Sequence, residues 1–245
     1  MEHTKADDDN KHELARLESQ HEVMVHAMGK LVFAPIDFSD PGLRILDSGT
    51  ANGRWLRDLR AETKAKHTYV GTDIVASLLP TNPPEGMSFV QQSITEPWPA
   101  EMNGTFDLVH QRFVLAGSAG TPLPTVIGGL AGLLKSGGWL QCVEMDVEDV
   151  EGNGPAVTDV LKVFREMFAG IGLGFNFAKK LKGVMEEVGL MHVEDTVVYS
   201  SHGAKTEKQE LFNQSIEHLT SAIAPMMAVY KCKFRCPQPI GVCIY

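Results

Sequence analysis

The sequence lacks a long apolar run, a surplus of positive charge and a cysteine framework. No stretch reaches the roughly 18 apolar residues that span a bilayer, and residues 1–11 are polar, with Asp7, Asp8 and Asp9 where a secretion signal would be apolar. Lys and Arg number 22 against 31 Asp and Glu, and the resulting net charge of −9 argues against binding to nucleic acids or anionic membranes. Four cysteines in 245 residues are too few for a disulfide scaffold, so we expect a reduced, cytoplasmic setting.

Metal ligation is not indicated either. Cys232, Cys236 and Cys243 gather near the end of the chain without the close C-x₂-C pair that is typical of zinc sites. An acidic run from Asp146 to Glu151 has no partnering acid–Asn pair elsewhere, so it favours a solvated loop. We therefore expect no metal site.

What is present is an ordinary globular composition, 43% hydrophobic and 22% charged, in a chain of the length of one α/β domain. Short apolar runs bounded by turn residues predict buried strands, and apolar residues three or four apart predict amphipathic helices. The expected strands are 43–47, 68–73, 87–91, 106–110, 139–144, 191–200 and 240–245. The expected helices are 13–28, 53–63, 126–135, 156–169, 178–188 and 205–223.

Strands separated by helices predict βαβ units, and hence a single α/β domain with a seven-stranded, mostly parallel sheet and helices on both faces. We expect residues 1–12 to form a flexible tail and residues 13–245 to form the domain. The helix at 13–28 would cap the cleft of the sheet, with Gln20 and His21 pointing inward.

The first expected strand runs into a loop of small residues, 47–53, with the sequence DSGTANG. In open α/β sheets, ligands bind beyond the carboxyl ends of the strands. There, glycines let the backbone approach a ligand, and the next helix offers free N–H groups. Asp73 ends the following strand, where a carboxylate can accept hydrogen bonds from ribose hydroxyls. Two strand-end acids with a glycine loop between them predict a nucleoside cofactor.

The loop does not match the dinucleotide pattern G-x-G-x-x-G, because Ala51 and Arg54 take the second and third glycine positions after Gly49. The phosphate-loop pattern G-x-x-x-x-G-K-[ST] is absent from the sequence. Asp47, two residues before Gly49, suits a ligand with an ammonium group. S-adenosylmethionine carries an ammonium, a carboxylate, a ribose and an adenine, and it fits this set of residues.

Residues 45–55, ILDSGTANGRW, resemble motif I of class I S-adenosylmethionine-dependent methyltransferases, in the form of the fungal secondary-metabolite (LaeA-like) branch. Further similar stretches occur in the order and spacing of that branch at 16–21 (RLESQH), 96–99 (EPWP), 106–112 (FDLVHQR) and 134–141 (LKSGGWLQ). The resemblance extends from about Leu14 to Leu190. It implies a Rossmann-like fold and methyl transfer to an oxygen or nitrogen of a small fungal secondary metabolite, with S-adenosylhomocysteine as product.

The resemblance also implies cofactor-binding roles for residues at the strand ends. Asp47 would fix the ammonium directly or through water, and Asp73 would hold the ribose. The methionine part would be wrapped by Gly49, Thr50, Asn52 and Gly53, and the adenine would lie against Ile74, Ser93 and Ile94. Apart from the resemblance, Gln111 follows an expected strand end that opens toward the methyl group, and we count it with the binding residues. Two positions depart from the family pattern. Ser93 replaces an acid, and Ala51 replaces a glycine.

Methyl transfer from a sulfonium is an in-line displacement, so the enzyme mainly aligns the reactants in a dry pocket. A base is needed only when the acceptor is protonated. His110, at an expected strand end and with an ordinary pKa of about 6.5, is the candidate catalytic residue, while a backbone hydrogen bond is its alternative role. Glu144 and Asp146 end the next strand and are weaker candidates.

Two other functions stay open at this point. One is a regulatory protein that keeps the fold and acts through protein partners. The other is an enzyme that binds the cofactor and rearranges its substrate without methyl transfer. Fold class alone does not separate these functions from methyl transfer to a small molecule.

Overall fold

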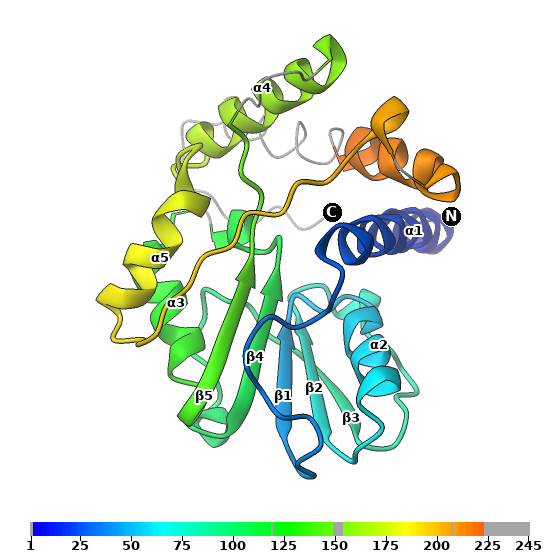
Figure 1. The fold of residues 1–245 in the computed structure, drawn as a ribbon. Helices are drawn as coiled ribbons and strands as arrows, with labels where there is room; N and C mark the ends of the chain where they lie inside the picture. Colours follow the sequence, from blue (N-terminus) through cyan, green and yellow to red (C-terminus); the bar gives the residue numbers. More distant parts are fainter. Residues whose placement is uncertain (1, 119, 149–153, 207, 223–245) are drawn as a thin grey trace.

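A computed structural model describes residues 2–118, 120–148, 154–206 and 208–222 (Figure 1). Its centre is a five-stranded parallel sheet with the strand order β3-β2-β1-β4-β5. The strands are β1 (Arg44–Ser48), β2 (Thr68–Asp73), β3 (Met87–Gln91), β4 (Phe106–Arg112) and β5 (Leu134–Val143). The first five expected strands are therefore confirmed, but β5 begins at Leu134 and not at Trp139, and the expected helix 126–135 ends already at Ala131.

Helices cover both faces of the sheet, as the alternation of elements predicts (Figure 1). The α-helices are α1 (Glu2–Met28), α2 (Arg54–Thr63), α3 (Leu123–Ala131), α4 (Pro155–Gly170) and α5 (Phe177–Glu187), and residues 212–222 are also helical. Single 3₁₀ turns occur at η1 (Ala76–Leu78), η2 (Ala100–Met102), η3 (Leu115–Ser118), η4 (Gly203–Lys205) and η5 (Gln209–Leu211). In these described ranges, no helix is long and apolar enough to cross a membrane.

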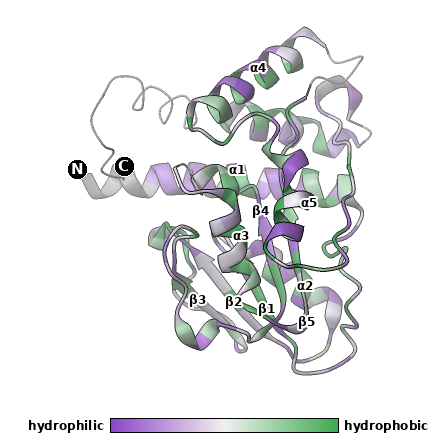
Figure 2. Ribbon diagram, turned by 90° about the vertical axis from the view of Figure 1, so that its left-hand side faces the viewer, coloured by the Kyte–Doolittle hydropathy of each residue, from purple (hydrophilic) through white to green (hydrophobic). Residues whose placement is uncertain are grey.

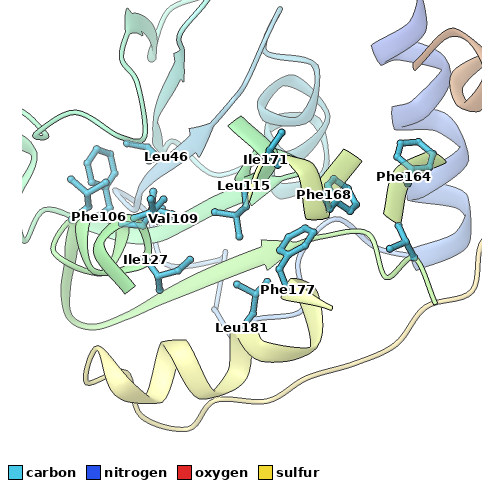
Figure 3. Packing of buried hydrophobic residues seen from close by; sticks show 14 of the residues in the cluster. Leu46, Phe106, Val109, Leu115, Ile127, Phe164, Phe168, Ile171, Phe177 and Leu181 are labelled. Atoms are coloured by element: carbon cyan, nitrogen blue, oxygen red, sulfur yellow. The ribbon is translucent and has the colours of Figure 1, made fainter. Parts of the chain in front are cut away.

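Successive strand residues point to opposite sides of the sheet. Because helices cover both sides, apolar strand residues are buried on both faces. In β1, Ile45 packs with Trp55 and other residues of α2, whereas Leu46 belongs to the cluster under α3, α4 and α5. Figure 3 shows the second cluster, in which Phe106 and Val109 of β4 lie close to Ile127 of α3. Each face of the sheet thus has its own core.

The expected seven-stranded sheet is wrong for the described residues, which contain five strands. Residues 191–200 form no strand, and Met191 and Tyr199 are 80% and 74% exposed. Alternating apolar residues place their side chains on one face of a strand. A strand also needs a neighbouring strand to pair with its backbone N–H and C=O groups. No described segment pairs with residues 191–200. The expected strand at 240–245 and the three terminal cysteines lie outside the described residues.

The first helix is longer than the sequence pattern suggests. It begins at Glu2, not at Glu13, because neither glycine nor proline interrupts residues 2–28. It ends where Gly29 turns left-handed, at φ +70°, and donates its N–H to the Val25 carbonyl at 2.9 Å. Its later turns lie across the carboxyl ends of the strands, in the position expected for a capping helix (Figures 1 and 2).

Candidate functional site

The loop from β1 to α2 has a left-handed backbone at three positions, Gly49 (φ +73°), Ala51 (φ +47°) and Gly53 (φ +74°). The N–H groups of Gly49 and Thr50 donate to the Thr72 carbonyl at 2.7 and 2.9 Å, which ties the loop to the end of β2. A Cβ atom at position 49 would lie 2.2 Å from Cγ2 of Val114. The glycine there meets both a conformational and a packing requirement.

Asp73 holds the other side of this loop. Its Oδ2 accepts the Ala51 N–H and its Oδ1 accepts the Val75 N–H, both at 2.9 Å. Burial raises the pKa of the Asp73 carboxyl, the nearby Asp47 carboxylate adds to the shift, and the two amides oppose it. Ile74 and Val75 follow immediately, 57% and 42% exposed, so an apolar surface lies directly beside the acid.

Asp47 and His110 form a buried pair at the ends of β1 and β4, where the strand register places them side by side. The Nδ1 atom of His110 lies 2.7 Å from Oδ1 of Asp47. Because a carboxylate only accepts, we assign the imidazole proton to Nδ1, which donates it. Burial lowers the pKa of His110 and keeps the ring neutral. Its Nε2 atom is then an acceptor, buried and without a partner among the described residues.

A second histidine connects α1 to the sheet. The Arg112 guanidinium, a donor, lies 2.9 Å from Nδ1 of His21, and Nε2 of His21 lies 2.9 Å from Oδ2 of Asp58 in α2. The proton of the neutral ring therefore sits on Nε2, which donates to Asp58. Burial and the Arg112 charge lower the pKa of His21 to about 4. We call this set, His21 with Arg112 and Asp58, the His21 bridge.

A small cavity of about 50 Å³ lies between α1, the loop and the end of β4. Its walls carry both signs of charge, which suits a zwitterionic amino-acid group. The lining residues include Glu18, Gln20, His21, Asp47, Thr50, Asn52, Arg54, Trp55, His110 and Arg112. Besides His110 Nε2, the hydroxyl of Thr50 is buried in this wall without a partner among the described residues. Unpartnered buried polar atoms are costly, so a polar ligand fits here.

Three of the predicted binding residues, Gln111, Ser93 and Ile94, do not line this cavity. Gln111 is fully buried on the opposite face of β4 from His110, where Ser48 donates to its Oε1 at 3.2 Å. Ser93 bonds with Thr95, hydroxyl to hydroxyl, at 2.8 Å. Ile94 packs against the cluster under α3. Asn52 does line the cavity, and its amide donates to Glu18 of α1 at 3.2 Å.

The sequence interpretation gives no binding role to Glu18 or Arg54, although both line the cavity. Helix periodicity could have indicated Glu18, because it precedes the inward-facing His21 by three residues. Arg54 is the first residue of α2 and the last but one residue of the motif at 45–55.

Glu144, a weaker candidate base, lies outside this cavity. Its Oε1 accepts the N–H groups of Val114 and Leu115 at 3.1 and 3.0 Å. Burial raises the pKa of its carboxyl to about 7.

No group of three or more His, Cys, Asp or Glu that could hold a metal ion occurs among the described residues. Asp146 and Glu148, from the acidic run, contact Lys179 of α5. Asp149 and Glu151 lie outside the described residues.

A family model described as a methyltransferase domain matches residues 17–194. The chain is 46% identical over 201 residues to methyltransferase psoC of Aspergillus fumigatus, covering 82% of this chain and 73% of the relative. It is 40% identical over 188 residues to N-methyltransferase sirN of Leptosphaeria maculans, covering 76% and 66%. It is 33% identical over 217 residues to N-methyltransferase gliN of Aspergillus fumigatus, covering 86% and 77%. The chain thus spans about two thirds to three quarters of these relatives.

Solved structures agree with the fold. A chain in the complex of the Haloferax volcanii Trm112 methyltransferase activator with a methyltransferase superposes with a TM-score of 0.54, at 16% identity, over 79% of this chain and 78% of that chain. Phosphoethanolamine N-methyltransferase 2 of Haemonchus contortus, in complex with S-adenosyl-L-methionine, gives a TM-score of 0.50 at 13% identity, over 83% of this chain and 46% of that chain. At these identities the likeness is one of fold.

Proposed function

The chain belongs to the methyltransferase-domain family, in the branch of fungal secondary-metabolite S-adenosylmethionine-dependent methyltransferases, and from that premise we propose that it methylates a nitrogen or oxygen of a small metabolite. Nitrogen is the first candidate, because the relatives sirN and gliN are named N-methyltransferases. The names of the relatives do not favour a purely regulatory protein or an enzyme of rearrangement.

One observation carries the cofactor assignment. Two acids, Asp47 and Asp73, lie at the ends of adjacent parallel strands on either side of a left-handed loop, and Thr50 and His110, which line the cavity beside it, each carry a buried polar atom without a partner among the described residues. Asp73 would accept hydrogen bonds from the ribose hydroxyls, and the exposed Ile74 and Val75 would pack against the adenine. Thr50, Asn52 and Asp47 would hold the methionine end, and Ser93, Ile94 and Gln111 would act from outside the cavity.

When bound, S-adenosylmethionine supplies the electrophilic methyl group. The protein contributes position and dryness. The α1 helix covers the end of the sheet, and the cavity of about 50 Å³ lies between this helix and the loop. The buried ring of His110 is held by Asp47 at Nδ1 and stacks on Trp55. A ring fixed in this way supports a binding role for His110 over general-base catalysis.

The test is calorimetric titration of the protein with S-adenosylmethionine and S-adenosylhomocysteine, beside Asp73→Ala. We expect binding by the wild-type protein and its loss in the variant. Asp107→Ala is the matched control. Asp107 also accepts a backbone N–H, from Arg44 at 2.7 Å, but it lies near the amino ends of the strands, opposite to the site. If neither ligand binds the wild-type protein, the proposed function is wrong.

Turnover with candidate amines, amides and alcohols then tests the reaction itself. Release of S-adenosylhomocysteine together with a product heavier by one methyl group would support methyl transfer. A product of unchanged mass, with no S-adenosylhomocysteine released, would overturn it in favour of rearrangement.

A further inference from the structure

The Nε2 atom of His110 is an acceptor with nothing to accept from. The ring is 1% exposed, its Nδ1 donates to Asp47 at 2.7 Å, and one face lies against Trp55. Nε2 is buried and has no hydrogen-bond partner among the described residues, and the ring forms part of the cavity wall. A buried acceptor left unpaired costs stability, so the functional state should bring a donor to this atom.

The surroundings define that donor. His110 and Asp47 line the same cavity, so a donor that reaches Nε2 also lies near the Asp47 carboxylate. A group that satisfies both Asp47 and a neutral imidazole nitrogen must carry at least two N–H or O–H donors, and a positive charge adds attraction to the Asp47 carboxylate. A primary ammonium meets these conditions. The guanidinium of Arg112 bonds with Nδ1 of His21, and no hydrogen bond joins it to Nε2 of His110.

We propose that His110 is a binding residue, whose Nε2 accepts a hydrogen bond from the α-ammonium of the cofactor while Asp47 accepts another. This assignment rests on the proposed function and deepens it. Asp47 then has two tasks, because it fixes the imidazole tautomer through Nδ1 and binds the ammonium directly. The assignment also removes His110 from the role of general base, since its one free nitrogen is committed to the cofactor.

His110→Asn tests this directly. The Asn amide can donate to Asp47 from the place of Nδ1, but it leaves no acceptor at the place of Nε2. Three ligands with the same nucleoside separate the contributions. S-adenosylhomocysteine carries ammonium and carboxylate, its decarboxylated analogue carries only the ammonium, and methylthioadenosine carries neither. Calorimetry should show affinity reduced about tenfold or more for the first two ligands, with methylthioadenosine changed less than about twofold.

Two further variants keep the test sharp. His67→Asn is the matched control, because His67 is also a buried histidine with unpartnered nitrogens. It directly precedes β2, at the amino ends of the strands and away from the site. Its substitution should not change the affinity for any of the three ligands. His110→Gln places an amide oxygen near the position of Nε2 and should recover part of the affinity. Thermal melting without ligand checks that each variant is folded.

The outcomes are distinct. Equal losses for all three ligands, or no loss for any of them, would overturn the assignment while the cofactor site stands. A loss for S-adenosylhomocysteine without one for the decarboxylated analogue would also overturn it, because the carboxylate would then be the partner. Failure of the wild-type protein to bind S-adenosylhomocysteine would overturn both the assignment and the proposed function.

Discussion

The imidazole of His110 lies flat against the indole of Trp55, with ring centroids 3.8 Å apart and ring planes 2° apart. Both rings line the cavity between α1 and the loop. The fluorescence of an indole in van der Waals contact with an imidazole depends on the hydrogen bonds that the imidazole makes. The fluorescence of Trp55 should therefore report ligand binding at the site.

We expect tryptophan fluorescence to change when S-adenosylhomocysteine is added, and Trp55→Phe to abolish that change. The chain has only two other tryptophans, Trp98 and Trp139. Trp98 contacts Gly129 of α3, away from the cavity, so Trp98→Phe should keep the signal. A ligand-dependent signal that persists in Trp55→Phe would contradict this prediction.

Gly49→Ala should destabilise the protein much more than Gly29→Ala. The two glycines have nearly the same φ, +73° and +70°, but a Cβ at 49 would lie 2.2 Å from Val114, whereas nothing lies within 4 Å of one at 29. Left-handed backbone alone costs alanine about 1 kcal/mol, and overpacking adds about 2 kcal/mol. Urea denaturation measures both free energies of unfolding. Equal losses would show that conformation alone requires Gly49.

The His21 bridge should make stability sensitive to acid. Its folded pKa of about 4 lies below the ordinary 6.5, so the unfolded chain binds the proton more readily between these values. The stabilisation from the neutral ring is complete above pH 6.5 and is lost as pH falls toward 4, by up to about 3 kcal/mol. His21→Gln, which keeps a donor toward Asp58, should lose less stability over this range.

Urea denaturation at intervals from pH 7 to 4 measures the effect. His26→Gln, an exposed histidine on the same helix, controls for the general loss of an imidazole. Parallel curves for wild type and His21→Gln would argue against a neutral bridging histidine.

Glu144 should act in the opposite sense. Its folded pKa of about 7 lies above the ordinary 4.5, so the protonated form is favoured on folding, and stability is lost as pH rises through 7. Glu144→Gln keeps an oxygen for the Val114 and Leu115 amides. Relative to wild type, this variant should gain about 1 to 2 kcal/mol between pH 5 and pH 8, allowing for partial exposure. A gain that does not depend on pH would refute the raised pKa.

Much of the fold could be predicted because its signals are local. The strand Thr68–Asp73 combines β-branched and aromatic residues with an acid at its end, and its bounds are those expected. Residues 191–200 show the limit of this reasoning. Their pattern is that of a strand, but whether a strand forms depends on a neighbour that may lie anywhere in the chain, and no described segment provides one.

The site divides in the same way. The sequence by itself determined the loop at 47–53 and its flanking acids, because the positions of glycines and of strand ends depend on residues close together in the chain. It could not show that His110 faces Asp47, since that depends on the register of β1 against β4, nor that His21 joins α1 to Arg112 and Asp58. These contacts join residues 37 to 91 positions apart. Only the tertiary structure decides such partners, because packing sets which side chains meet, and their pKa values and free acceptor atoms follow from that meeting.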